Sequence, residues 1–164
     1  MKSKGFEEMI CSVAGALGAV EDRWGLLIIR DLLFGLRRYD ELRKSTGITH
    51  ATLSGRLKKL EETGVITRRL YQKKPDRYEY HLTPKGQALE VVIMALAQVG
   101  DTWNSEDLPG PPIRFVNGAT GHDLKLKPVD EKTGAIVRIA DVRIEAGPGA
   151  DDLAKWRITK RTKG

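Results

Sequence analysis

Apolar residues recur every three or four positions in several stretches of the first hundred residues, which is the spacing of helices with one buried face. The stretch from Trp24 to Phe34 is apolar almost all round, which is typical of a central buried helix. The stretch 50–63 instead has a single apolar stripe, formed by Leu53, Leu57 and Leu60. The pattern predicts helices over residues 6–20, 24–34, 39–44, 50–63 and 84–103.

Residues with known preferences for helix ends stand at these boundaries. Thr46-Gly47-Ile48 predicts a tight turn, and Thr49 is a good N-cap for the helix that follows. Gly64 is suited to end that helix, and Thr83-Pro84 to begin the last one. The third and fourth helices are therefore expected to be joined by a very short turn.

Two short runs rich in β-forming residues, 65–70 and 77–82, flank the polar segment Gln72-Lys73-Lys74-Pro75-Asp76. Such a pattern predicts a hairpin with a basic tip. Helix, helix, tight turn, helix and hairpin in this order indicate an α+β fold of the winged helix-turn-helix kind.

The pattern changes after the proline-rich segment 108–112. Leu124 and Leu126 alternate with lysines, and residues 137–143 again mix apolar and polar positions, which favours strands. We predict a winged-helix domain over residues 1–107 and a small β-rich appendage over 108–164, with a break at 147–149 and a basic tail from Lys155 to Lys163.

Charge adds a second, independent signal. The chain carries a formal net charge of +6, yet residues 37–77 alone hold 12 Lys and Arg against 5 Asp and Glu, a net charge of +7. The excess is thus confined to the segment that holds the third helix, the turn, the fourth helix and the hairpin, as expected of a phosphate-binding surface.

Other features exclude several locations and classes. No apolar run approaches the roughly 20 residues of a membrane helix, and the N-terminus lacks the apolar core of a signal peptide. We therefore expect a cytoplasmic, nucleoid-associated protein with no membrane contact. The single cysteine, Cys11, rules out a disulfide within the chain.

A helix placed like the fourth one can enter the major groove of double-stranded DNA. We expect its non-apolar side to contact bases through His50, Thr52, Ser54 and Arg56. An alternative for Arg56 is an ion pair with Glu41 or Glu62. Phosphate contacts are assigned to Lys59 and the hairpin cations, namely Arg68, Arg69, Lys73, Lys74 and Arg77.

Three other classes of function compete with DNA binding. An enzyme is disfavoured because Gly121-His122-Asp123 has no partner for nucleophilic chemistry and no phosphate-binding glycine loop is present. RNA binding is disfavoured because no aromatic stacking platform is evident. A winged-helix module that binds an acidic protein is the remaining alternative, and the salt dependence of DNA binding distinguishes the two.

Four features carry a resemblance to a known family: Cys11 and the stretches DRWGLLIIRDLLFGLRRYDELRKSTGI, LSGRLKKLEETGVITRRLY and YEYHLTPKG. With them the chain resembles the HxlR family of bacterial winged-helix regulators, relatives of the MarR group. The resemblance covers about residues 11–100. It implies a homodimer joined through the first and last helices, with two recognition helices in successive major grooves, that represses or activates nearby genes. The wide apolar surface of residues 84–103 is consistent with such a dimer.

The resemblance also raises two questions about cofactors and effectors. Some members use a cysteine at the position of Cys11 to sense oxidants, so sensing and simple packing are both open here, as is response to a small molecule. Some relatives carry a zinc ribbon at the C-terminus, but the extension here keeps Gly121-His122 and Gly147-Pro148-Gly149 without any cysteine. We therefore predict no structural zinc and no cofactor.

Overall fold

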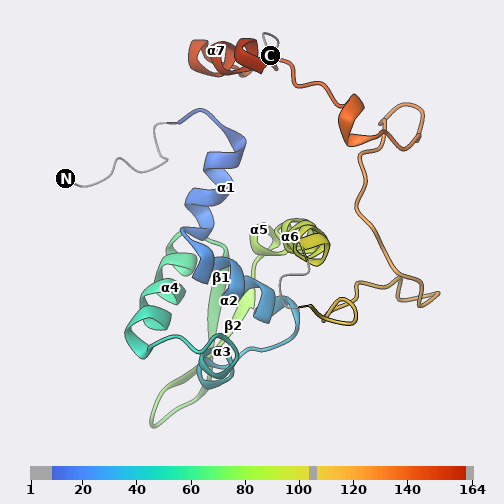
Figure 1. Cartoon of the computed structure of the whole chain (residues 1–164). Coiled ribbons are helices and arrows are strands. Elements are labelled where there is room, and N and C mark those ends of the chain that lie inside the picture. Colours follow the sequence, from blue (N-terminus) through green and yellow to red (C-terminus); the bar gives the residue numbers. More distant parts are fainter. Residues whose placement is uncertain (1–8, 104–106, 162–164) are drawn as a thin grey trace. The chain divides into compact units, whose positions relative to one another are not determined.

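A computed structural model describes residues 9–103 and 107–161 (Figure 1). Packing divides the chain into two compact units, Met1–Ile93 and Met94–Gly164. The elements of the first unit are α1 (Ser12–Val20), α2 (Arg23–Leu33), α3 (Tyr39–Thr46), α4 (His50–Glu62), β1 (Ile66–Gln72), β2 (Arg77–Leu82) and α5 (Pro84–Gln87). Helix α6 (Glu90–Trp103) crosses the division, and the second unit continues with a 3-10 turn (Ile139–Asp141) and α7 (Asp152–Arg161).

Helix α2 is the centre of the first unit. Ile28, Ile29 and Leu32 are completely buried, and α2 contacts α1, α3, α4 and β2. Its first turn is capped by Asp22, whose Oδ1 accepts hydrogen bonds from the backbone N–H groups of Trp24 and Gly25 at 2.9 and 3.1 Å. The nearly continuous apolar surface predicted for this segment thus packs against several elements around the helix.

The turn between α3 and α4 is formed as the sequence predicts. Gly47 ends α3 with a left-handed backbone (φ 70°), and the Thr49 side chain accepts a hydrogen bond from Thr52 N–H at the start of α4. Leu42, Ile48 and Leu53, which lie before, within and after the turn, are buried. Shared burial of these three side chains fixes the angle between the two helices.

Strands β1 and β2 form an antiparallel hairpin in which Ile66 lies opposite Leu82 and Leu70 opposite Tyr78. The register shifts between Leu70 and Gln72, and the tip projects beyond α3 and α4 (Figure 1). The backbone N–H of Tyr80 donates to the Arg37 carbonyl at 2.8 Å, which joins the hairpin to the start of the helix-turn-helix. The winged helix-turn-helix prediction is confirmed.

The first and last predicted helices of the domain differ from expectation. Helix α1 begins at Ser12, because Cys11 has an extended backbone (φ −159°, ψ 120°); residues 6–8 of the predicted helix lie outside the described residues. The predicted helix 84–103 is two helices, with a turn at Ala88-Leu89 where Leu89 N–H bonds to the Gly86 carbonyl.

The predicted β appendage is the main error in the expected fold. Among the described residues 107–161, two isolated bridges occur, Val116 with Asp123 and Val129 with Ile136, and no longer strand ladder forms. Each bridge closes a turn; in the second, Asp130 Oδ1 accepts from the N–H groups of Lys132 and Thr133. Alternation of apolar residues is a poor guide here, because most of these side chains stay exposed and therefore bury no face of a sheet.

The predicted basic tail is also partly a helix, α7. Asp151 caps it by accepting a hydrogen bond from Ala154 N–H at 2.7 Å, and Lys155 lies 3.6 Å from Asp152. The sequence contains a signal for the start of this helix, namely an aspartate directly after Gly147-Pro148-Gly149-Ala150. Residues 162 and 163 of the tail lie outside the described residues.

Candidate nucleic-acid interface

The start of helix α4 is held against α3 by a cluster of polar side chains. The Tyr39 hydroxyl lies 2.9 Å from the His50 carbonyl oxygen, to which it donates, and 3.0 Å from Ser54 Oγ. The His50 ring stacks on the Tyr39 ring at 5.6 Å between centroids, and its Nδ1 lies 3.2 Å from the Tyr39 hydroxyl. These contacts fix the orientation of the residues at the N-terminus of α4.

Helix α4 buries one stripe and exposes the opposite one. Leu53, Leu57 and Leu60 are at most 3% exposed and pack inward. The exposed positions of the first three turns carry small or polar side chains and one cation, and they are His50, Ala51, Ser54, Gly55 and Lys58; Glu62 is exposed in the last turn. A helix surface without bulky side chains can approach the base edges of a major groove closely.

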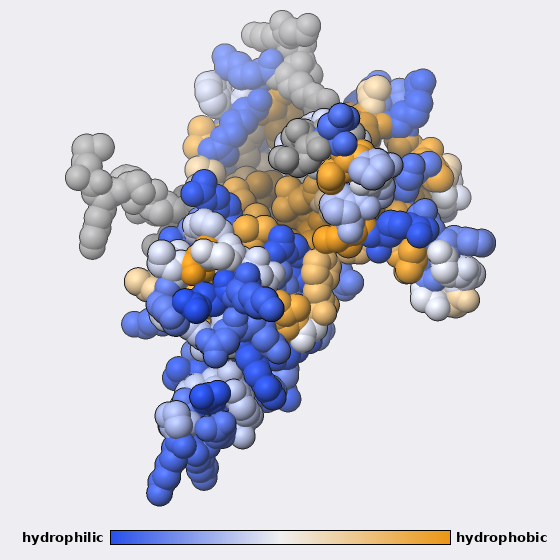
Figure 2. Space-filling view, turned by 60° about the horizontal axis from the view of Figure 1, so that its bottom comes forward, coloured by the Kyte–Doolittle hydropathy of each residue, from blue (hydrophilic) through white to orange (hydrophobic). Residues whose placement is uncertain are grey.

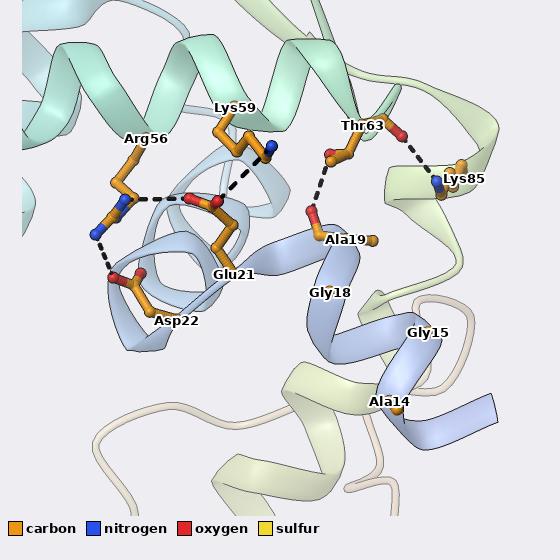
Figure 3. Close-up of a pocket in the computed structure, with 10 residues that line it drawn as sticks. All are labelled: Ala14, Gly15, Gly18, Ala19, Glu21, Asp22, Arg56, Lys59, Thr63 and Lys85. Atoms are coloured by element: carbon orange, nitrogen blue, oxygen red, sulfur yellow. Dashed lines mark hydrogen bonds and ion pairs between the residues drawn. The ribbon is translucent and has the colours of Figure 1, made fainter. Parts of the chain in front are cut away.

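Thr52 and Arg56 lie on one flank of the exposed stripe. Thr52 is half-buried, and its hydroxyl contacts that of Thr49 at 2.9 Å. Arg56 points toward the junction of α1 and α2 (Figure 3), where its guanidinium contacts Glu21 at 3.1 Å and Asp22 at 2.8 Å. Arg56 therefore does form ion pairs, but with neither of the carboxylates, Glu41 and Glu62, that the sequence suggested.

Lys59 lies on the same flank, one helical turn further along. Its ammonium is 4.0 Å from Glu21 and 3.8 Å from Glu62. Arg56 and Lys59 are thus brought together around Glu21, whereas His50 and Ser54 gather around Tyr39. The expected site residues of α4 thus fall into two groups, with Thr52, Arg56 and Lys59 on one flank and His50 and Ser54 at the edge of the exposed stripe that lies next to Tyr39.

The hairpin cations differ in how they are held. Arg68 contacts Glu61 at 3.5 Å and lies over the Tyr78 ring at 4.8 Å. Arg38, which the sequence did not single out, similarly lies over Tyr71 and contacts Glu79 at 3.3 Å. Stacked on tyrosines, both guanidinium groups have fewer conformations to lose on binding a phosphate.

The cations nearer the hairpin tip are exposed. Within the part of the chain that the structure describes, none of them has a carboxylate within 4.0 Å; they are Arg69, Lys73, Lys74 and Arg77. Figure 2 shows the hairpin as a projection covered by hydrophilic residues. This tip is the most freely available positive charge beside α4.

One carboxylate in the interface region has a perturbed pKa. Glu41 Oε2 accepts hydrogen bonds from the backbone N–H groups of Arg37 and Arg38, each at 2.9 Å, and these bonds lower the pKa of Glu41 from its ordinary 4.5. Glu41 thereby caps α3 rather than neutralising a recognition residue.

Tyr39 and Glu21 are the site residues that sequence reasoning missed. Tyr39 lies at the first position of α3 and contacts residues 11 and 15 positions later, a separation that helical spacing does not predict. The sequence does contain a signal for the position of Arg56. It follows Leu53 by three residues and precedes Leu60 by four, a spacing that places it beside the buried stripe.

Cys11 lies at the N-cap position of α1 and is half-buried. Its role as an oxidant sensor stays a prediction. Among the described residues no group of three or more potential metal-binding side chains is found, and no helix there is long and apolar enough to cross a membrane.

Similarity to known proteins agrees with this geometry. The model of the HxlR-like helix-turn-helix family matches residues 19–108. An uncharacterised HTH-type transcriptional regulator of Mycobacterium tuberculosis is 38% identical over 84% of this chain and 87% of its own length. A similar regulator of Synechocystis is 32% identical over 60% of this chain and 73% of its own length.

Solved structures give the same picture. A candidate transcription factor of Pseudomonas aeruginosa is 33% identical, with a TM-score of 0.62, and covers 90% of this chain and 99% of its own. The redox regulator HypR in its oxidised form is 28% identical, with a TM-score of 0.51, over 56% of this chain and 96% of its own. With more than half of its length matched by the family model, the chain belongs to the HxlR-like helix-turn-helix family of DNA-binding transcriptional regulators.

Proposed function

We propose that this protein binds an inverted-repeat operator as a homodimer and regulates transcription of neighbouring genes from the cytoplasm. The observation that carries the proposal is the exposed stripe of α4, which is small and polar and lies beside a hairpin whose tip cations have no carboxylate partner among the described residues. Helix and hairpin together offer contacts to base edges and to phosphates.

Within this proposal the interface residues have different roles. The base contacts come from His50 and Ser54, which Tyr39 supports, and from Thr52, whose hydroxyl contacts that of Thr49. Phosphates are bound by Lys59 and the hairpin cations, that is Arg68, Arg69, Lys73, Lys74 and Arg77. Arg56 orients α4 through its ion pairs with Glu21 and Asp22, a change from the base contact expected from sequence.

The homodimer is proposed from exposed apolar surface. On α6, Val92, Leu96, Val99 and Trp103 recur every three or four residues and are 39–73% exposed. On α1, Val13 and Leu17 are 67% and 43% exposed. A row of exposed large apolar side chains along a helix is typical of a surface that a second subunit covers.

The operator can be recovered by selection from genomic DNA. The full-length protein is mixed with fragmented genomic DNA at about 150 mM salt, and the retained fragments are sequenced and footprinted. We expect protection of two half-sites whose centres lie about 10 base pairs, or a multiple, apart. Retention of random fragments only, or protection of one asymmetric half-site, would contradict the proposal.

The hairpin's role is tested on the recovered operator with Lys73→Ala. Removing one phosphate contact should weaken binding to all sequences alike and reduce the slope of log affinity against log salt by about 0.9 for each subunit. Lys132→Ala, in an exposed turn of the second unit, is the control and should leave the slope unchanged. An acidic protein as the true partner would instead give no operator and weak, sequence-independent retention of DNA.

A further inference from the structure

A pocket of about 580 Å³ lies between α1, α4 and the start of α5 (Figure 3). It is on the flank of α4 that carries Arg56 and Lys59. Its volume is within the range of small-molecule sites. The lining residues are Ala14, Gly15, Gly18, Ala19, Glu21, Asp22, Arg56, Lys59, Thr63 and Lys85. All of them belong to the first unit of the chain.

One wall of the pocket is apolar and almost free of side chains. It is the face of α1 formed by Ala14, Gly15, Gly18 and Ala19. A Cβ atom added at Gly15 would meet nothing within 4 Å, so space in front of this wall is open. Such a surface fits the flat or narrow apolar body of a small molecule.

The facing side of the pocket is cationic. Arg56, Lys59 and Lys85 contribute three positive charges against the two negative charges of Glu21 and Asp22. Arg56 Nε is buried and has no hydrogen-bond partner, while the two terminal nitrogens of the same guanidinium contact the carboxylates. The Lys85 ammonium donates to the Thr63 carbonyl at 2.7 Å, which leaves it two further protons to donate.

We propose that this pocket binds a small organic monoanion, with its carboxylate against the cations of α4 and α5 and its apolar body on the α1 wall. The positive excess of the lining and the two unused protons of the Lys85 ammonium select for an anion. Because both carboxylates of the lining already contact Arg56, a metal cation would have to break those pairs, whereas an anion would add to them or replace one.

The pocket is connected directly to the recognition helix. Asp22 caps α2 with Oδ1 and pairs with Arg56 through Oδ2, while Glu21 has a positive φ (66°), which is unfavourable for a residue with a side chain. A bound carboxylate competes with Glu21 for Arg56 and Lys59. Since this step rests on the proposed function, it predicts that ligand and operator alter each other's affinity by the same factor.

Calorimetric titration of the full-length protein tests the binding itself, without DNA. The probe is benzoate, and benzamide, which has the same ring without the charge, is its control. We expect saturable binding of benzoate and at least tenfold weaker binding of benzamide. The absence of saturable benzoate binding would overturn the proposal.

Variants of the lining residues locate the site, because some should weaken benzoate binding and one should strengthen it. Gly15→Leu fills the pocket and Lys85→Met removes a donor, so each should weaken benzoate binding about tenfold. Glu21→Gln removes the charge that competes with benzoate for Arg56 and Lys59, so this variant should bind benzoate more tightly. Ala16→Leu, which adds the same side chain at an exposed position of α1 outside the lining, should have no effect. Equal affinities in all four variants would place benzoate elsewhere.

The coupling is measured separately, as operator affinity with and without benzoate. A shift in wild type that is absent in Gly15→Leu supports the coupling. If benzoate binds but operator affinity is unchanged, the pocket is a binding site and its regulatory role is rejected. If no operator exists while benzoate still binds, the proposed function fails and the pocket stands.

Discussion

Arg56 is the residue whose interpretation changes most between sequence and structure. As an arginine in a recognition helix it suits base contact, since its planar guanidinium can bind guanine in two places. In the structure both terminal nitrogens contact carboxylates at the α1–α2 junction. The distinction matters because the two roles have different energetic signatures.

If Arg56 bound a base, Arg56→Ala would cost about 1–3 kcal/mol at one base pair only. Removal of partly exposed ion pairs that orient a helix costs about 1 kcal/mol or less and affects every operator alike. We expect the second result, a reduction in affinity of about fivefold or less that is uniform across single-base operator variants. Binding to a panel of such variants measures it.

Glu21→Gln is the matched control for this experiment, because it weakens the same pair from the opposite side. In the absence of any ligand it should give a reduction that is also uniform but smaller, because the pair between Arg56 and Asp22 remains. A change in preference at one base pair in Arg56→Ala, but not in Glu21→Gln, would restore the base-reading role.

At the scale of single elements, helix α3 shows how a carboxylate can fix the start of the helix-turn-helix. Glu41 accepts two backbone hydrogen bonds and its pKa is lowered by them. The contribution to stability is therefore complete above pH 4.5, the ordinary pKa, and is lost as the pH falls through the lower folded-state pKa.

Glu41→Gln keeps an amide oxygen that can accept the two backbone hydrogen bonds but removes the charge, so it should destabilise the protein at pH 7 by less than the roughly 1 kcal/mol of a lost helix cap. As the pH falls below 4.5, the difference from wild type should shrink toward zero. Urea unfolding at a series of pH values measures this. A difference that is constant with pH would mean that the charge of Glu41 contributes nothing.

The elements that the sequence predicts well are those whose burial follows a simple period. Helices α2, α3 and α4 lie within two residues of their expected bounds, since one apolar stripe or a fully apolar helix decides each of them. The appendage differs from its prediction because alternation without burial does not make a sheet. No local pattern signals the break between α5 and α6, which lies two residues from a close tertiary contact.

That contact is at Gly86, where an added Cβ would clash with the Val65 carbonyl oxygen and lie 2.9 Å from a Leu82 methyl group. Gly86→Ala must therefore push α5 away from the base of the hairpin. We expect the free energy of unfolding to fall by at least about 1–3 kcal/mol. Thermal unfolding measures it as a fall in Tm of several degrees.

Gly15→Ala is the matched control, because the new Cβ meets nothing within 4 Å and the position is helical. It should leave stability unchanged or raise it by about 0.5–1 kcal/mol. If both alanine variants were equally stable, the close approach at Gly86 would not be what fixes α5.

At the scale of the whole molecule, α6 packs within its own chain and also carries the apolar row that we propose a second subunit covers. Its C-terminal half belongs to the second unit, where the Gln98 side chain exchanges hydrogen bonds of 3.1 and 2.9 Å with the backbone of Leu126. Ile93 is buried in the first unit. The row Val92, Leu96, Val99 and Trp103 remains exposed in the single chain, and we propose that the second subunit covers it.

Leu96→Asp tests this arrangement, because Leu96 is 51% exposed and the single chain does not need it for its core. A carboxylate in a covered apolar surface costs several kcal/mol for each subunit unless it is paired. We expect wild type to sediment as a dimer and Leu96→Asp as a folded monomer with unchanged helix content. Operator affinity should then fall far more than for any single contact, because a monomer occupies one half-site only.

Gln87→Asp, which adds the same charge at an exposed position of α5, is the control and should remain dimeric. A wild type that sediments as a monomer, or a Leu96→Asp variant that stays dimeric, would show that the exposed row on α6 is not the surface that joins two subunits.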